Sequence, residues 1–237
     1  MKIDEFVNEL KKCNIYLSDE QLEKFEKYAE FLMEYNKTTN LTAIKDKESI
    51  YLKHFYDSLL VCHNEALRFD DVESIIDIGS GAGFPGMALK ILYPHLKLTL
   101  LDSNNKKTKF LEKLANLLDF NDVLVVNDRA ENFVKNNRHK YDVSIARAVS
   151  DLRIISELCL PFTKVGGYFI AQKGHYEDEL KNASNTIKKL NAEVLCVSEF
   201  ELPFEKSFRA NIFIRLNKEI ESKYPRSYDQ IIKKELK

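Results

Sequence analysis

The segment richest in residues that could bind a ligand runs from Ile75 to Gly86 and reads IIDIGSGAGFPG. The chain holds seven glycines, and four of them lie within positions 79–86. A turn of alternating glycines leaves bare backbone that a ligand can approach closely, and Pro85 after it is typical of a helix start. We therefore expect a ligand-binding turn between a strand and a helix.

The register of these glycines distinguishes two kinds of adenosine-containing ligand. Residues 81–86 (GAGFPG) match the dinucleotide pattern, but in that pattern the first glycine directly follows the strand. Here the apolar strand ends at Ile78, so the first glycine is Gly79, and read from there the third glycine is missing. Residues 77–83 (DIGSGAG) match a second pattern, Asp-x-Gly-x-Gly-x-Gly, whose carboxylate and first glycine fall at the end of the strand as that pattern requires. The carboxylate of Asp77 would favour the ammonium and sulfonium of S-adenosylmethionine and repel a pyrophosphate.

A second carboxylate, Asp102, ends the next apolar stretch. An acidic residue about 20 positions after a glycine loop is placed to accept hydrogen bonds from both hydroxyls of a ribose. Nucleotide sites share this feature, so it predicts an adenosine ligand without choosing between the two kinds. Asp102 could also be the N-cap of the next helix, and it could serve as both. The candidate cofactor-binding residues at these two strand ends are Asp77, Gly79, Ser80, Gly81, Gly83, Asp102 and Ser103.

Short apolar runs alternate with helical patterns from Ser74 onwards, and this order predicts the elements that position the two carboxylates. Continuous apolar strands separated by helices indicate βαβ units in a parallel sheet covered on both faces. The expected strands are 74–78, 97–101, 123–126, 142–146 and 167–171. The expected helices between and after them are 104–118, about 150–160 and about 176–190.

Two further strand candidates, 192–202 and 209–216, have no helical pattern between them and predict an antiparallel pair at the end of the sheet. Five parallel strands and this pair make seven, whereas an ordinary dinucleotide-binding sheet has six parallel strands. The predicted fold class is α/β: a doubly wound, seven-stranded, mostly parallel sheet with a C-terminal antiparallel strand pair. This is the Rossmann-like architecture of class I methyltransferases.

The residues before Ser74 predict helices and no strand. An apolar stripe covers 3–10, Ser18 and Gln21 have the spacing of a capping box, and a third helical stretch covers about 46–60. Such apolar faces need a partner, and no flexible linker separates them from the sheet. The expected organisation is a single methyltransferase domain (1–237), with an N-terminal helical extension (1–65), a cofactor-binding core (70–217) and a basic C-terminal tail (218–237).

Composition limits the class of protein. Apolar residues make up 44% of the chain, too many for disorder, yet no stretch approaches the ~20 apolar residues of a membrane-spanning helix. The four cysteines are far apart and form no CxxC pair, which fits a reducing cytoplasm. We expect a cytoplasmic monomer with no metal and no membrane partner.

Net charge is −1, which counts mildly against binding of nucleic acid by the molecule as a whole. A local basic face could still bind RNA. Taken singly, each basic cluster is better interpreted as a solvated helix face. The clusters are Lys106, Lys107 and Lys109; Lys188 and Lys189; and Lys218, Lys223 and Arg226.

The chain resembles the bacterial RsmG (GidB) family of 16S ribosomal RNA guanine-N7 methyltransferases. The glycine loop alone would indicate only a methyltransferase, whereas HFYDSL together with the loop and ARAV is much more specific. The matching stretches keep the family order over nearly the whole chain. They are 40–44, 54–59, 77–86, 101–103 with Lys106 and Lys107, 129–131, 146–149, 166–167, 173–174 and 224–226.

This resemblance implies that Gly79, Phe84, Ala130, Glu131 and Arg147 contact S-adenosylmethionine and that Asp102 lies nearby. It also implies a substrate, 16S ribosomal RNA or the small-subunit particle, methylated at N7 of guanine 527 in the 530 loop. The candidates on the substrate side are His54, Asp57, Ser58, Lys106, Arg147 and Lys173.

Arg147 ends the fourth predicted strand, on the rim that faces both cofactor and substrate. The alternative interpretation of this residue is a salt bridge to Asp142 or Asp151.

Motifs that are absent narrow the acceptor atom. The chain lacks the Asn/Asp-Pro-Pro-aromatic motif of exocyclic amine methylation. Methylation at pyrimidine C5 needs a cysteine nucleophile, and Cys159 lies in an apolar helical context that would raise its pKa. Guanine N7 has a free lone pair and no proton, so we expect no general base.

Two other functions stay open at the level of sequence. A methyltransferase of a small molecule or of another RNA would share the glycine loop and Asp102. A non-catalytic RNA-binding ribosome-assembly factor would explain the basic clusters but not the loop.

Overall fold

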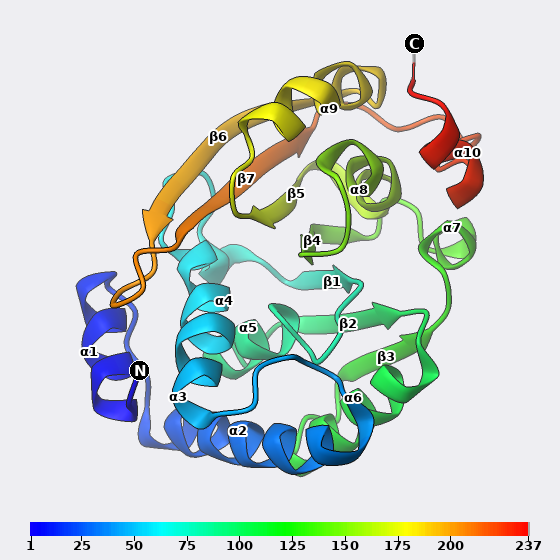
Figure 1. Cartoon of the computed structure of the whole chain (residues 1–237). Helices are drawn as coiled ribbons and strands as arrows, with labels where there is room; N and C mark the ends of the chain where they lie inside the picture. The colour runs from blue at the N-terminus through cyan, green and yellow to red at the C-terminus, as the bar shows by residue number, and fades with distance from the viewer. Residues whose placement is uncertain (237) are drawn as a thin grey trace.

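A seven-stranded sheet crosses the molecule, and helices cover both of its faces (Figure 1). The computed structural model describes residues 1–236, and its strand order is β3-β2-β1-β4-β5-β7-β6. The first five strands are parallel, and β7 runs antiparallel to both β5 and β6. The predicted fold class is confirmed. The strands are β1 (Ser74–Ile78), β2 (Lys97–Asp102), β3 (Val123–Asn127), β4 (Tyr141–Arg147), β5 (Thr163–Lys173), β6 (Ala192–Glu201) and β7 (Phe208–Leu216).

Helices precede the sheet and connect its strands. The stretch predicted as one helix over 46–60 is divided, because Tyr51–Tyr56 form π-helical turns between two short α-helices. Such turns are frequent at functional sites. The α-helices are α1 (Ile3–Lys12), α2 (Asp19–Thr39), α3 (Lys47–Ile50), α4 (Asp57–Leu59), α5 (Gly86–Leu92), α6 (Asn105–Leu117), α7 (Ala130–Phe133), α8 (Leu152–Cys159), α9 (Glu177–Lys189) and α10 (Tyr228–Lys233).

Each face of the sheet has its own hydrophobic core, because successive side chains of a strand point to opposite faces. Ile75 lies in the core that contains residues of α1, α2, α5 and α6. Its neighbour Ile76 lies in the core that contains residues of α8, α9 and α10. Phe25 of α2 and Phe55 of the π-helical turns are both fully buried, with ring centroids 4.9 Å apart. The N-terminal helices therefore share a core with the sheet.

The capping box predicted at the start of α2 is present, and it also joins this helix to α5. Ser18 Oγ accepts a hydrogen bond from the backbone of Gln21, and Gln21 Oε1 accepts one from the backbone of Ser18. The amide nitrogen of Gln21 then donates to the carbonyls of Ile91 (3.0 Å) and Leu92 (2.8 Å). These bonds fix the position of α2 against the helix that follows the glycine loop.

After β7, the C-terminal segment packs into the core on one face of the sheet. Tyr224, Ile231 and Leu236 are buried in the core on the α8 and α9 side. The segment expected as a basic tail is thus anchored over most of its length, and α10 lies beside α7 and α8 (Figure 1). Within residues 1–236, no helix is both long enough and apolar enough to span a membrane.

Candidate active site

The loop after β1 is held in shape by its own backbone. Gly79, Gly81 and Gly83 all have positive φ angles, which residues with a Cβ rarely adopt. The backbone of Gly79 donates to the carbonyl of Leu101 (2.8 Å), and that of Gly83 donates to the carbonyl of Ser80 (2.7 Å). Ser80 is buried, and its hydroxyl donates to the Asp77 carbonyl (2.8 Å). The loop is therefore preformed between β1 and α5.

Asp102 ties this loop to the end of β2. Its Oδ2 accepts a hydrogen bond from the backbone of Gly81 (3.0 Å), and its Oδ1 accepts one from the backbone of Asn104 (2.8 Å). Lys107 Nζ lies 3.6 Å from Oδ2. The N-cap of α6 is Asn104, not Asp102. A carboxylate has about four lone-pair sites, so Asp102 keeps capacity for further donors such as ribose hydroxyls.

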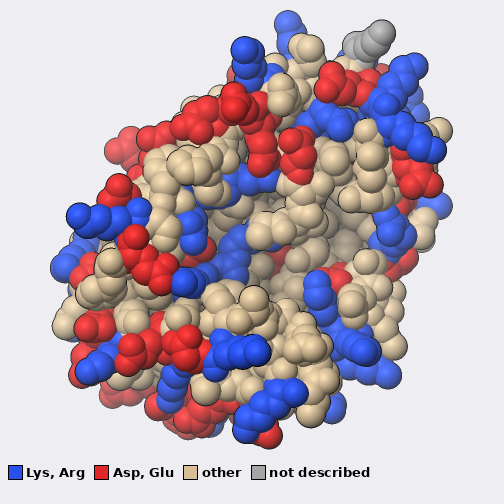
Figure 2. Space-filling view, viewed as in Figure 1, with Lys and Arg blue, Asp and Glu red and all other residues tan. Residues whose placement is uncertain are grey.

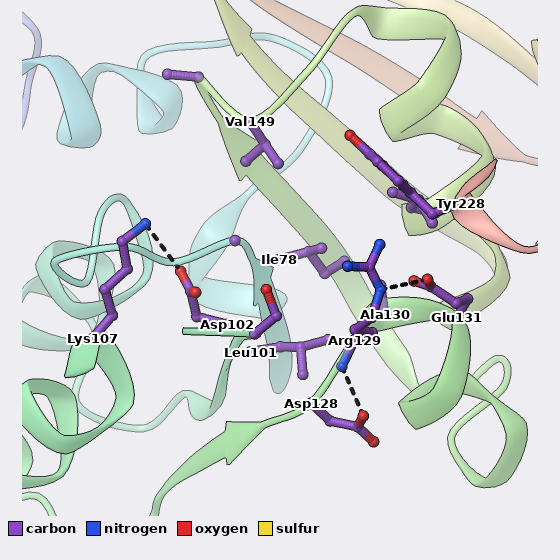
Figure 3. A pocket seen from close by; sticks show the side chains of 14 residues that line it. Ile78, Leu101, Asp102, Lys107, Asp128, Arg129, Ala130, Glu131, Val149 and Tyr228 are labelled. Atoms are coloured by element: carbon purple, nitrogen blue, oxygen red, sulfur yellow. Dashed lines mark hydrogen bonds and ion pairs between the residues drawn. The ribbon is translucent and has the colours of Figure 1, made fainter. Parts of the chain in front are cut away.

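A cavity of about 360 Å³ opens at the carboxyl ends of β1 to β4 (Figure 3). This volume lies in the range of small-molecule sites, about 300–1,000 Å³. Its walls combine apolar side chains, such as Leu101 and Val149, with the carboxylates of Asp102 and Glu131. Asp102 and Lys107 lie on one side of it in Figure 3, and Glu131 lies on the other. We name this space the first cavity.

The predicted cofactor-binding residues divide into two groups. Those that line the first cavity are Gly79, Asp102, Ser103, Ala130 and Glu131. The residues that do not line it are Asp77, Ser80, Gly81, Gly83, Phe84 and Arg147. Phe84 is buried and stacks on Tyr28 with ring centroids 5.1 Å apart.

The buried side chain of Asp77 supports the glycine loop from inside the protein. It is fully buried, its Oδ2 accepts a hydrogen bond from the backbone of Gly86 (2.8 Å), and its Oδ1 has no partner. Burial raises the pKa of this carboxyl to about 7, because the charged form loses its hydration. The side chain therefore holds the loop against the start of α5, and it does not present its carboxylate to the first cavity.

This buried carboxyl predicts a pH-dependent stability. Because its pKa is higher in the folded state, Asp77 favours folding below its ordinary pKa of 3.8, and this contribution is lost as the pH rises to about 7. The whole change amounts to roughly 4 kcal/mol at most. We expect Asp77→Asn to match the wild-type free energy of unfolding at pH 4 and to exceed it by about 2–4 kcal/mol at pH 8. Urea unfolding at both pH values measures the difference, and a gap independent of pH would contradict the expectation.

A second cavity of about 460 Å³ lies beside the first, and Ala148 lines both. Four of the predicted substrate-side residues line it: His54, Asp57, Arg147 and Lys173. The other two do not. Ser58 is fully buried with an unpaired hydroxyl, and Lys106 is exposed at the start of α6. The second cavity brings together residues from the π-helical turns, β4, β5 and β7.

Arg147 is the central side chain of the second cavity. It donates to the carbonyl of Lys53 (3.0 Å), to Nδ1 of His54 (3.0 Å) and to the carboxylate of Asp57 (3.3 Å). Its guanidinium also lies over the ring of Phe84, 5.1 Å from the centroid. The alternative of a salt bridge to Asp142 or Asp151 is wrong, because Asp142 pairs with Lys164 and Asp151 caps α8.

The contacts of His54 exclude it as a proton carrier. Since Arg147 donates to Nδ1, the ring proton is on Nε2, which donates to Thr42 Oγ1 (3.0 Å). Burial and the neighbouring guanidinium lower the pKa of His54 to about 3, so the ring stays neutral. His54 therefore orients Arg147.

Burial also raises the pKa of Cys159, as its apolar context predicts, and this disfavours a cysteine nucleophile.

Several residues of the two cavities were not predicted. Asp128 and Arg129 directly follow β3, so the rule that ligands bind at strand ends would have found them. Lys53, Lys107, Val149 and Gln172 also line the cavities and are close in sequence to predicted site residues. Tyr228, Arg209 and Asn211 carry no local signal, because they come from the C-terminal part of the chain. Among residues 1–236, no group of three or more His, Cys, Asp or Glu side chains is placed to hold a metal ion.

The sheet order, the glycine loop after β1 and a cavity at the strand ends define a class I, Rossmann-like methyltransferase. The solved structure of TYW2 from M. jannaschii in complex with AdoMet has the same fold, with a TM-score of 0.51. It is 14% identical in sequence, and the match covers 62% of this chain and 70% of that one.

The chain belongs to the GidB family, rRNA small subunit methyltransferase G, whose model matches residues 21–208. Ribosomal RNA small subunit methyltransferase G of Bacillus cytotoxicus is 46% identical over 229 residues, which cover 95% of each chain. The protein of the same name from Fusobacterium nucleatum subsp. nucleatum is 46% identical over 233 residues, covering 98% of this chain and 99% of the relative. The predicted family is confirmed.

Proposed function

We propose that this protein transfers a methyl group from S-adenosylmethionine to N7 of a guanine in 16S ribosomal RNA, guanine 527 of the 530 loop. Membership of the family supports the reaction and the substrate. The observation that carries the proposal is the pair of adjoining cavities, one suited to an adenosine ligand and one lined with basic and amide side chains. We also propose that the enzyme acts as a cytoplasmic monomer on free RNA or on the small-subunit particle.

The first cavity fits the cofactor. Asp102 would accept hydrogen bonds from the ribose hydroxyls, while the apolar walls and Ala130 would hold the adenine. The backbone of Gly79 lines the same space, so the ligand can lie close to the main chain. When bound, S-adenosylmethionine supplies the methyl group on its sulfonium.

The second cavity fits the base and its phosphates. Four basic side chains line it: Lys53, Arg147, Lys173 and Arg209. Figure 2 shows Lys and Arg side chains inside the hollow near the centre of this face. Phosphate groups bind such cations, so they would bring the RNA to the cavity. Two carboxylates, Asp57 and Glu179, also line the cavity and pair with three of these cations, so the lining keeps an excess of positive charge although the net charge of the chain is −1.

Two amide side chains on interior strands of the sheet, which line the second cavity, have unpaired hydrogen-bonding groups. Gln172 and Asn211 are register partners on β5 and β7. Gln172 donates to the Asp57 carbonyl (3.2 Å) and to Asn211 Oδ1 (3.1 Å), and these bonds fix both amides. Gln172 Oε1 and Asn211 Nδ2 are left without partners. Both unpaired atoms are buried, with almost no surface open to a ligand, so they do not by themselves favour a purine.

The chain's own residues would mainly align the reactants. Methyl transfer is an in-line displacement, so its rate depends on holding donor and acceptor in line and on excluding water. Guanine N7 needs no base, which agrees with a neutral His54 whose two nitrogens are both engaged. The methylated base is cationic, and nearby carbonyl groups would stabilise that charge, because the Asp57 carboxylate is already paired with Arg147 and Arg209.

The position and chemistry of the product test the proposal. 7-Methylguanine in RNA allows cleavage by reduction followed by aniline. We expect cleavage at guanine 527 in RNA from wild-type cells, none in RNA from a strain that lacks the gene, and restored cleavage when the gene is returned. Cleavage that persists in the deletion strain would refute the assignment.

An in vitro assay distinguishes the competing functions. Purified protein and labelled S-adenosylmethionine are incubated in parallel reactions, each with one candidate substrate: free 16S RNA, small-subunit particles or a small molecule from a panel. We expect label in one of the two RNA samples. Label only in a small molecule would favour a different substrate class, and a protein that binds no cofactor would favour a non-catalytic assembly factor.

A further inference from the structure

The chain beyond β7 lies outside residues 21–208, which the family model matches, yet it reaches the first cavity. Tyr228, the first residue of α10, lines this cavity together with Glu131 and Arg129. Figure 3 shows its ring on the same side as Glu131 and on the side opposite Lys107. The C-terminal segment, nearly a hundred residues beyond Glu131 in sequence, thus forms part of the wall of the first cavity.

Partly buried hydrogen bonds hold this segment in place. Arg138 donates to the carbonyls of Ile220 (2.9 Å) and Tyr224, and Arg153 donates to that of Ile231 (2.8 Å). Arg226 forms a two-point contact with the carboxylate of Glu157, a residue that is only 1% exposed. Because these contacts tie the segment to the main body and to α8, Tyr228 has a defined position.

The ring of Tyr228 faces a side chain of the same cavity. The Arg129 guanidinium lies over this ring, 4.9 Å from its centroid, and Arg129 is itself held by Glu131 at 2.6 Å. A phenol ring and a guanidinium both present flat π surfaces, and such surfaces bind nucleobases by stacking. The Asp102 carboxylate, suited to ribose, lies across the cavity from this pair (Figure 3).

We infer that Tyr228 is a cofactor-binding residue whose ring, with the Arg129 guanidinium, forms the wall against which the adenine of S-adenosylmethionine stacks. The inference rests on the proposed function, because it assumes an adenosine ligand in the first cavity. The C-terminal segment then completes the cofactor site, in addition to the glycine loop and Asp102.

Calorimetry with S-adenosylhomocysteine and with adenosine tests this role. Stacking on an aromatic ring contributes about 1–3 kcal/mol, so we expect Tyr228→Ala to weaken both ligands by about ten- to one-hundred-fold. Tyr228→Phe keeps the ring and should stay within about threefold of wild type. Tyr16→Ala, at an exposed tyrosine on the N-terminal segment, is the matched control and should bind as wild type.

The outcomes separate this inference from the proposed function. Wild-type binding together with unchanged affinity in Tyr228→Ala would overturn only the role of Tyr228. Absence of ligand binding by the wild type would overturn the proposed function, and the inference with it. A structural role is excluded when Tyr228→Ala loses affinity but keeps the wild-type melting temperature. Equal losses in Tyr228→Ala and Tyr228→Phe would also contradict stacking, since the phenylalanine ring is retained.

Discussion

Replacing Asp102 with alanine is expected to weaken binding of S-adenosylmethionine by at least about one-hundred-fold. The variant loses the acceptor for two ribose hydroxyls, and hydrogen bonds to a charged group contribute about 1.5–3 kcal/mol each. It also frees the backbone donors of Gly81 and Asn104, which Asp102 holds at 3.0 and 2.8 Å. The loop and the cofactor site are therefore weakened by one change. Calorimetry with the purified variant measures the loss.

Two controls separate the loss of ligand contacts from the loss of loop structure. Asp102→Asn keeps one oxygen acceptor and should lose less affinity than Asp102→Ala. Asp178→Ala removes an exposed carboxylate of α9 and should leave both affinity and melting temperature unchanged. Wild-type affinity in Asp102→Ala would remove the adenosine site from the first cavity.

Replacing Arg147 with alanine is expected to lower kcat/KM for RNA methylation by at least about 100-fold, while affinity for S-adenosylhomocysteine changes less than about threefold. A small misplacement of reacting groups can cost about 100-fold in rate. Arg147 holds His54, Asp57 and the Lys53 carbonyl around the second cavity, and its side chain does not line the first. Its loss would disturb the acceptor side and leave the cofactor side intact.

Arg147→Lys tests whether the charge alone is sufficient. The guanidinium bonds three partners at once, and a lysine cannot reproduce this fork, so we expect little recovery. Arg215→Ala, at an exposed arginine of β7, is the matched control. Equal losses of cofactor affinity and of rate in Arg147→Ala would place Arg147 in the cofactor site, as the family resemblance implies.

Local signals in the sequence were sufficient for the order and type of the core elements. The apolar run 74–78 predicts β1 with its observed bounds, because a buried strand with a glycine turn after it has a clear pattern. Boundaries that depend on neighbouring strands were less accurate. The strand predicted at 167–171 extends over Thr163–Lys173, since pairing with β4 and β7 continues beyond its apolar centre.

The sequence by itself determined the fold class, the family, the glycine loop and the position of Asp102, because each of these depends on residues that are neighbours in the chain or on a family pattern. Only the tertiary structure decided which partners Arg147 has and that Asp77 lies buried beneath the loop. It also brought Asn211 and Tyr228 to the two cavities from the last quarter of the chain. The physical reason is that such contacts form between segments far apart in sequence, where sheet register and packing set the distances and no local pattern records them.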